Sequence, residues 1–179
     1  MKVTGPWVAG STVQVGSSVR FRMTWTRSST DLTTLVGVVI FNPGLEGEVQ
    51  ADGSIRDGAT HRRVRALLAG ATEILVANLS PVRSTKPVEA RMACTALVDP
   101  DLDQQQADAL AWVCSAPVVV AAWGAGPFTE RMERSRAEVL RLARGRLWCW
   151  GTTQGGHPLH PSPLGRVGAG AELVRFGVG

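Results

Sequence analysis

The sequence predicts an α/β fold, a three-layer α/β/α sandwich around a central, mainly parallel sheet of four strands. Strands built around apolar runs are predicted at residues 32–41, 73–77, 118–122 and 146–150. Runs without polar alternation are typical of strands that are buried on both faces. Helical patterns separate these runs, and this βαβ rhythm favours parallel pairing. We therefore expect the four runs to end at one edge of the sheet, with 32–41 as the central strand.

Length and composition predict a single domain over residues 1–179. The chain has 179 residues, of which 44% are hydrophobic and 19% are charged, and this length suits one core better than two. Residues 1–17 are rich in glycine, serine and valine, so we expect an irregular N-terminal arm or a short edge strand there. The start lacks a signal-peptide core and no apolar run is long enough to span a membrane. We expect a cytoplasmic monomer without a membrane partner.

The net charge and the cysteine and histidine residues exclude few classes of function. The net charge of +4 is compatible with nucleic acid, but solubility explains it equally well. The three cysteines lack a C-x-x-C pair and are expected to be reduced core thiols. His157 and His160 lie close together without cysteine or acidic partners nearby, so we expect no metal and no cofactor.

Two further strands are expected at the edges of the sheet. Residues 18–27 alternate in polarity, which predicts a half-buried strand. Its expected apolar face is Val19, Phe21, Met23 and Trp25, and its expected polar face is Arg20, Arg22, Thr24 and Thr26. A turn is expected at 28–31, and a last edge strand at 173–178.

Helices are predicted at 57–68, 88–97, 102–114 and 128–144. Asp57 is a candidate N-cap of the first helix, and 128–144 is expected to be the longest, with charges that pair at i,i+4 spacing. Its expected inner residues are Met132, Val139, Leu140 and Leu142. Stretches rich in glycine predict loops at 45–56 and 151–170.

Polar and aromatic side chains follow the ends of the buried strands. An Asn-Pro-Gly turn at 42–44 follows the first, Asn78 ends the second, Trp123 follows the third, and a loop with His160 follows the fourth. Ligands of open α/β sheets bind at this edge. Amide side chains read donor–acceptor pairs on nucleobases, aromatic rings stack on bases, and arginines hold phosphate. The edge is therefore a candidate nucleotide site.

The sequence lacks the motifs of several common enzyme classes, and the polar and aromatic residues at the strand ends can also have purely structural roles. The chain lacks G-x-S-x-G, the G-x-x-x-x-G-K-[ST] phosphate loop and a G-x-G-x-x-G that follows a strand, which disfavours serine hydrolases, ATPases and dinucleotide enzymes. Asn42 and Asn78 can instead bond to nearby backbone at their turns. Trp123 can equally pack in the core.

The order and residue types of the strand-end motifs resemble the uracil-DNA glycosylase superfamily. The motifs are Asn42-Pro43-Gly44, Asn78 to Arg83, Trp123-Gly124 and His160-Pro161-Ser162-Pro163-Leu164. The first is similar to the G-x-N-P-G form of the mismatch-specific branch, although Ile40 stands where that form has its first glycine. The last is similar to the H-P-S-P-L form of the main uracil-excising branch.

A nearer resemblance covers roughly residues 18–168 and is to the bacterial and phage family called domain of unknown function 1643. The matching segments are Asp57-Gly58-Ala59-Thr60-His61-Arg62-Arg63, Asn78-Leu79, Arg83-Ser84-Thr85-Lys86-Pro87, Ala122-Trp123-Gly124 and Gly156-His157-Pro158-Leu159-His160-Pro161. They follow the N-P turn in the same order as in that family. The family name itself implies no activity.

The superfamily resemblance implies roles for individual residues. Asn42 would hold the attacking water, and His160 would donate a hydrogen bond to the departing base as negative charge develops. The residues implied to bind the base are Phe41, Pro43, Gly44, Asn78 and Trp123. The residues implied to contact DNA are Arg83, Pro161, Ser162, Leu164 and Arg166, with Leu164 entering the duplex in place of the flipped base.

The resemblance predicts a DNA glycosylase that excises a uracil-like or modified pyrimidine without metal. The main uracil-excising branch has aspartate in its first motif and a tyrosine soon after, whereas this chain has Asn42 and no tyrosine. An amide orients water but cannot accept its proton, and Glu46, Asp52 or Asp57 is a candidate for the missing base. A non-catalytic sensor of modified bases and an enzyme of free nucleotides remain the alternatives.

Overall fold

The computed structural model describes residues 6–15, 19–27, 34–44, 56–97, 99–162 and 167–177. The predicted turn at 28–31, residues 45–55 of the predicted loop and the implied DNA contacts Leu164 and Arg166 lie outside these residues.

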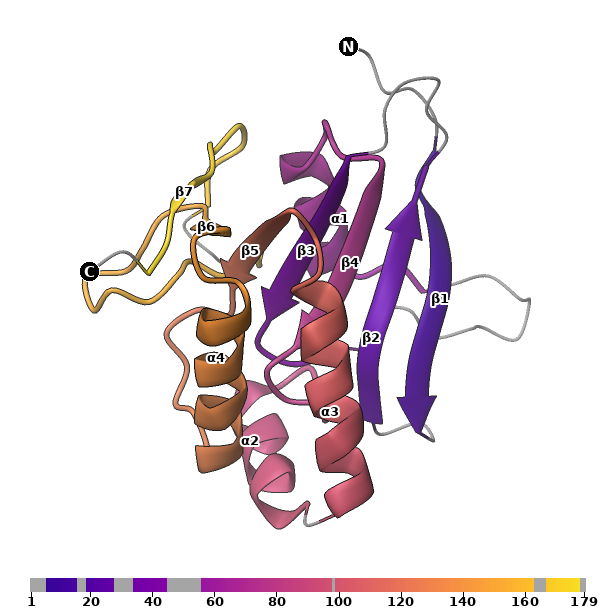
Figure 1. The fold of residues 1–179 in the computed structure, drawn as a ribbon, viewed down its shortest axis with the longest axis vertical. Coiled ribbons are helices and arrows are strands. Elements are labelled where there is room, and N and C mark those ends of the chain that lie inside the picture. The colour runs from indigo at the N-terminus through magenta and orange to yellow at the C-terminus, as the bar shows by residue number, and fades with distance from the viewer. Residues whose placement is uncertain are drawn as a thin grey trace.

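Among the described residues, seven strands form one sheet (Figure 1). The strands are β1 (Val8–Val15), β2 (Val19–Thr26), β3 (Leu35–Ile40), β4 (Glu73–Asn78), β5 (Val118–Ala122), β6 (Leu147–Cys149) and β7 (Val174–Arg175). Their order in space is β1-β2-β4-β3-β5-β6-β7. The inner strands β4, β3, β5 and β6 pair in parallel and are the four predicted apolar runs, while β1, β2 and β7 pair antiparallel. The predictions of a mainly parallel centre and of an extra N-terminal edge strand are confirmed.

Helices cover both faces of the sheet (Figure 1). They are α1 (Ala59–Leu67), α2 (Pro87–Ala96), α3 (Pro100–Val113) and α4 (Glu130–Leu142). Val64 of α1 packs with one set of alternate strand residues, such as Val38 and Val76. Met132 of α4 packs with the opposite set, such as Val39. The chain therefore crosses one face through α1 and the other face through α2, α3 and α4.

The central strand packs very closely against α3 at Gly37. A β-carbon built on Gly37 would lie 2.3 Å from the carbonyl oxygen of Val113 and 3.3 Å from the Ala116 side chain. The first contact is with backbone, which cannot move aside by rotation of a side chain. Only glycine therefore lets α3 sit at this depth on β3.

We expect Gly37→Ala to lower the free energy of unfolding by about 1–3 kcal/mol, because the new methyl group overpacks the core. Chemical denaturation of the variant and the wild type measures this. The matched control is Gly70→Ala, because a β-carbon there meets nothing within 4 Å. Equal unfolding midpoints for Gly37→Ala and the wild type would contradict the packing described here.

Strand β2 departs from the predicted alternation. Its ladder with β1 shifts register between the pairs Val13–Arg22 and Gln14–Arg20. Phe21 consequently packs with residues of α3, whereas Met23 and Trp25 pack on the α1 side. The prediction of one shared apolar face was wrong, and so was the exposed position predicted for Arg20, which is 1% exposed.

The start of α1 also differs from the prediction. Gly58 is the N-cap, without a side-chain hydrogen bond, so Asp57 does not cap the helix. The Asp57 carboxylate instead accepts from Arg65 at 2.5 Å, and the Arg65 guanidinium lies 4.0 Å from the centre of the Trp25 ring. His61 is buried and accepts a hydrogen bond from Trp25 Nε1 at 3.3 Å. Polar contacts thus fasten α1 to β2.

The remaining helices follow the predicted pattern with small corrections. Asp99 caps α3, accepting from the amides of Asp101 and Leu102, and α3 with 14 residues is longer than α4 with 13. Met132 and Val139 of α4 are buried as predicted, whereas Leu140 is 37% exposed and faces outward.

The cysteines Cys94, Cys114 and Cys149 are buried and are not joined in disulfides. Within the described ranges, none of the helices combines the length and the apolar character that a membrane crossing requires.

Candidate functional site

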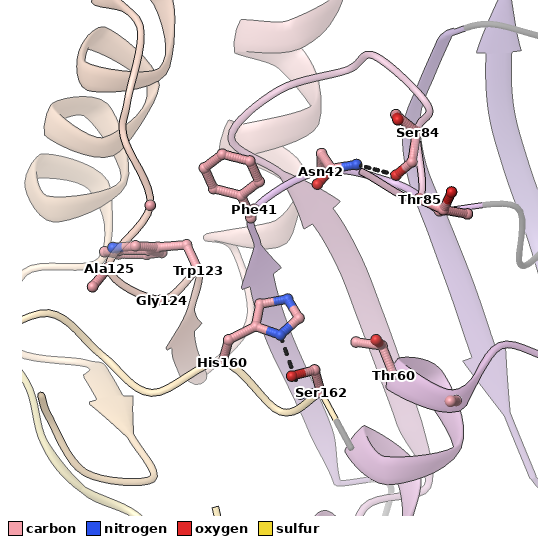
Figure 2. Close-up of a pocket in the computed structure, with 13 residues that line it drawn as sticks. Phe41, Asn42, Thr60, Ser84, Thr85, Trp123, Gly124, Ala125, His160 and Ser162 are labelled. Carbon is pink, nitrogen blue, oxygen red and sulfur yellow. Dashed lines mark hydrogen bonds between the residues drawn. The ribbon is translucent and has the colours of Figure 1, made fainter. Parts of the chain in front are cut away.

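A cavity of about 530 Å³ lies at the carboxyl edge of the parallel strands (Figure 2). Ile40 pairs with Asn78 of β4 on one side and with Ala122 of β5 on the other, so the three strands end level with one another. The chain passes from β3 to β4 on one side and later returns to β5 on the other. The space beyond β3 and β5 is therefore a topological switch point, where α/β proteins bind ligands.

The cavity is lined by residues from all the strand-end segments. They are Phe41, Asn42, Gly44, Ala59, Thr60, Ser84, Thr85, Trp123, Gly124, Ala125, Gly126, His160 and Ser162. The structure thus brings together five residues predicted for one site: Phe41, Asn42, Gly44, Trp123 and His160, with Ser162 beside them.

The Asn42 side chain has a defined orientation. Its Nδ2 donates to the carbonyl oxygens of Ser84 at 2.6 Å and of Pro43 at 3.1 Å. Carbonyl oxygens only accept hydrogen bonds, so these contacts identify the NH₂ end of the amide. Oδ1 has no hydrogen-bond partner in the described part of the chain. Asn42 therefore fixes its own turn and also keeps one acceptor available at the cavity.

A second loop holds this turn in place. The Ser84 amide donates to the Pro43 carbonyl oxygen at 3.0 Å, and Arg83 Nε donates to the Gly44 carbonyl oxygen at 3.3 Å. The turns after β3 and β4 are thus bound to one another by one backbone hydrogen bond and one hydrogen bond from the Arg83 side chain. Pro43 is buried and Arg83 is half-buried, and neither lines the cavity.

The His160 imidazole is neutral at physiological pH. Burial lowers its pKa to about 4. Nδ1 accepts a hydrogen bond from the Ser162 amide at 3.1 Å, so the single proton of the neutral ring is on Nε2. Figure 2 shows Nε2 on the side of the ring away from Ser162, directed into the cavity. His160 therefore offers a neutral N–H donor to whatever the cavity holds.

Glycine at position 124 allows His160 to approach β5. Gly124 has a φ of +78°, and a β-carbon there would lie 3.2 Å from the β-carbon of His160. Both the conformation and the close approach disfavour any larger residue. The Trp-Gly segment after β5 thus has a steric role in the site.

The depressed pKa of His160 predicts a loss of stability in acid. Between pH 6.5 and about 4 the unfolded chain binds a proton that the folded imidazole does not. Stability therefore falls with decreasing pH across this window, by on the order of 3 kcal/mol from this residue. Urea unfolding of the wild type and of His160→Asn at several pH values isolates the effect, since the asparagine oxygen can still accept from Ser162. Parallel pH profiles for the two proteins would contradict the assignment.

The aromatic residues of the site belong mainly to the core. Trp123 is 2% exposed, and its ring meets Phe176 edge-on with centroids 5.8 Å apart. Phe41 packs against Phe128 at 5.8 Å, and a β-carbon on Gly126 would lie 2.6 Å from the Phe41 ring. These contacts hold Phe41 rigidly where it forms part of the cavity wall.

Asn78 does not line the cavity. It is 1% exposed, and its carbonyl oxygen accepts from Gln106 Nε2 of α3 at 2.6 Å. Its side-chain oxygen has no hydrogen-bond partner within the part of the chain that the structure describes. The described geometry therefore separates Asn78 from Asn42 and His160, with which the sequence grouped it. Pro161 is buried next to the lining residue Ser162.

The sequence did not assign site roles to several lining residues. Ala59 and Thr60 begin α1, and Ser84 and Thr85 lie in the loop that holds Asn42. Thr60 and Thr85 both fall in segments that match the family motifs, and this was the available signal.

The cavity offers an acceptor, a donor and hydroxyl groups around an aromatic wall. No carboxylate is among the described residues that line it. The described residues also contain no group of three or more His, Cys, Asp or Glu side chains placed to bind a metal. Such a wall suits a neutral, planar and polar ligand.

The fold and the site define an α/β protein with a mixed sheet, whose central strands are parallel, and a cavity of small-molecule size at the carboxyl edge of those strands. The model of a family described as "Protein of unknown function (DUF1643)" matches residues 20–162, and the chain belongs to this family. No curated protein and no solved structure matches the chain.

Proposed function

We propose that this protein is a DNA glycosylase that flips a uracil-like or modified pyrimidine into the cavity and hydrolyses its N-glycosidic bond without a metal. The observation that carries the proposal is that one cavity contains both a neutral N–H donor, His160 Nε2, and an acceptor, Asn42 Oδ1. Helices on both faces of the parallel strands support the further proposal of a uracil-DNA-glycosylase-like sandwich.

His160 would act on the departing base. When the bond between the sugar C1′ and the base nitrogen breaks, its electron pair remains on the base and the negative charge spreads to the carbonyl oxygens attached to the ring. A neutral N–H donor already aimed at such an oxygen stabilises this charge without reorganisation. The low pKa keeps the His160 ring uncharged. An uncharged ring does not attract an anion into the cavity in place of the neutral base.

Asn42 would act on the water. Its Oδ1 accepts a hydrogen bond from the water that attacks C1′, while its Nδ2 is held by Ser84 and Pro43. The hydroxyl adds to C1′, and the second proton of the water ends on the released base through solvent. Orientation by the rigid turn is thus the contribution of Asn42, since an amide does not accept the proton.

The test is incubation with single-stranded and duplex oligonucleotides that carry uracil, hydroxymethyluracil or a bulkier pyrimidine, followed by alkaline cleavage. We expect abasic product from at least one of these bases. Absence of product from all of them, with DNA bound normally, would reject glycosylase activity.

A sensor of modified bases is the second candidate, favoured by the absence of a carboxylate from the described cavity wall. It predicts tight, base-dependent binding that Asn42→Ala and His160→Ala weaken, without turnover. An enzyme of free nucleotides would instead turn over a mononucleotide and leave DNA unshifted on a gel.

A further inference from the structure

The arginines of this protein differ in how their charges are balanced. All four arginines of α4 pair with carboxylates at 2.5 to 2.9 Å. The pairs are Arg131–Asp103, Arg134–Glu130, Arg136–Glu133 and Arg141–Glu138. Each arginine of α4 is therefore balanced by a carboxylate.

Two of the three arginines of α1 lack a carboxylate partner among the described residues. Arg65 is paired with Asp57. Arg62 and Arg63 donate to the backbone carbonyl oxygens of Asp57 and Val167, respectively. Within the described part of the chain, the charges of Arg62 and Arg63 are therefore not balanced by a carboxylate.

The guanidinium of Arg62 reaches the start of α1, the end of the helix that borders the cavity. Ala59 and Thr60 at this end line the cavity, whereas the Cα of Arg62, two residues after Thr60, lies about 200° around the helix axis from it. The Arg62 side chain turns back toward the start of α1, where Nη1 donates to the Asp57 carbonyl oxygen at 2.6 Å. Arg62 is exposed, and four of its five N–H groups remain for other acceptors.

We infer that the Arg62–Arg63 surface of α1 binds the phosphate backbone of DNA beside the cavity, and that the α4 surface does not. Uncompensated guanidinium groups bind phosphate bidentately, and a polyanion would neutralise the charge that this surface accumulates. The inference rests on the proposed function, because it concerns DNA whose base occupies the cavity. Beyond the proposed function, it specifies that the DNA strand runs across the α1 side of the molecule.

The test compares Arg62→Glu with Arg134→Glu. Both residues are on the surface, and both substitutions change the net charge by the same amount, so long-range attraction is matched. Fluorescence anisotropy with a labelled single-stranded oligonucleotide that carries one deoxyuridine, at about 50 to 200 mM salt, gives the affinity and its salt dependence. We expect R62E to weaken binding at least about tenfold and to lower the salt slope by about 1–2, and R134E to stay within about twofold of the wild type.

The possible results distinguish failure of the proposed DNA-binding surface from failure of the proposed glycosylase function. An equal loss in R134E, or wild-type binding by R62E, would overturn the surface while leaving glycosylase activity in place. Failure of the wild type to bind the oligonucleotide at any salt concentration would overturn both. If R62E unfolds at a lower temperature than the wild type, Arg62→Gln gives the same comparison with a neutral side chain, against Arg134→Gln.

Discussion

Replacement of His160 by alanine is expected to lower the rate of base excision by about 10²–10³-fold, the usual effect of removing one preorganised donor from a developing anion. The His160 side chain is neutral and half-buried, and the Ser162 amide at Nδ1 directs its Nε2–H group into the cavity. The measurement is single-turnover excision from an oligonucleotide that the wild type cleaves. Binding of the undamaged strand should change little, because the donor acts mainly in the transition state.

The matched control is His157→Ala, since His157 lies in the same loop but does not line the cavity. It should retain excision within a fewfold of the wild type. If both variants lost activity equally, the loop as a whole would be responsible and His160 would have no distinct role.

Asn42→Asp is expected to reduce both stability and excision, although aspartate is the stronger base. The substitution replaces Nδ2 by an oxygen that must face the carbonyl oxygens of Ser84 and Pro43. Two hydrogen bonds become contacts between acceptors, at a cost of on the order of 2–4 kcal/mol. The β3 turn should then move, and excision should fall by at least about tenfold because the water is misplaced.

Asn42→Ala provides the comparison, because it removes the hydrogen bonds without adding repulsion. It should destabilise the protein less, by about 1–2 kcal/mol. Urea denaturation and excision assays on the two variants give both quantities. An Asn42→Asp protein as stable as the wild type and faster in excision would show that the amide does not hold this turn.

The strands could be predicted where sequence pattern and environment agree. The inner residues of β3, β4 and β5 are apolar because both faces of each strand are covered, and the strand ranges were predicted to within a few residues. β2 was predicted at the right place with the wrong faces, since its register shift beside β1 depends on a partner strand and leaves no local signal. Asp57 has the sequence features of an N-cap, but tertiary pairing with Arg65 takes its carboxylate away from the helix.

The site could be predicted in part for the same reason. The parallel strands β3 and β5 end level and bring Asn42 and Trp123 together whatever their separation in sequence, and the loop after β6 carries His160 to the same cavity. Asn78 satisfies the same rule, yet it ends inside the sheet with its carbonyl oxygen bound to Gln106. Thr60 and Ser84 enter the cavity wall through the way α1 and the loop after β4 pack, which no strand-end pattern reports.

The structure of the protein bound to an oligonucleotide with an uncleavable uracil nucleotide is the most direct test of the central claim. The account predicts that the base occupies the cavity between Asn42 and His160. His160 Nε2 should then lie about 2.7–3.1 Å from a carbonyl oxygen of the base, with Asn42 Oδ1 on the side of the sugar C1′. A base bound outside the cavity, or inside it with no carbonyl oxygen near His160 Nε2, would contradict the account.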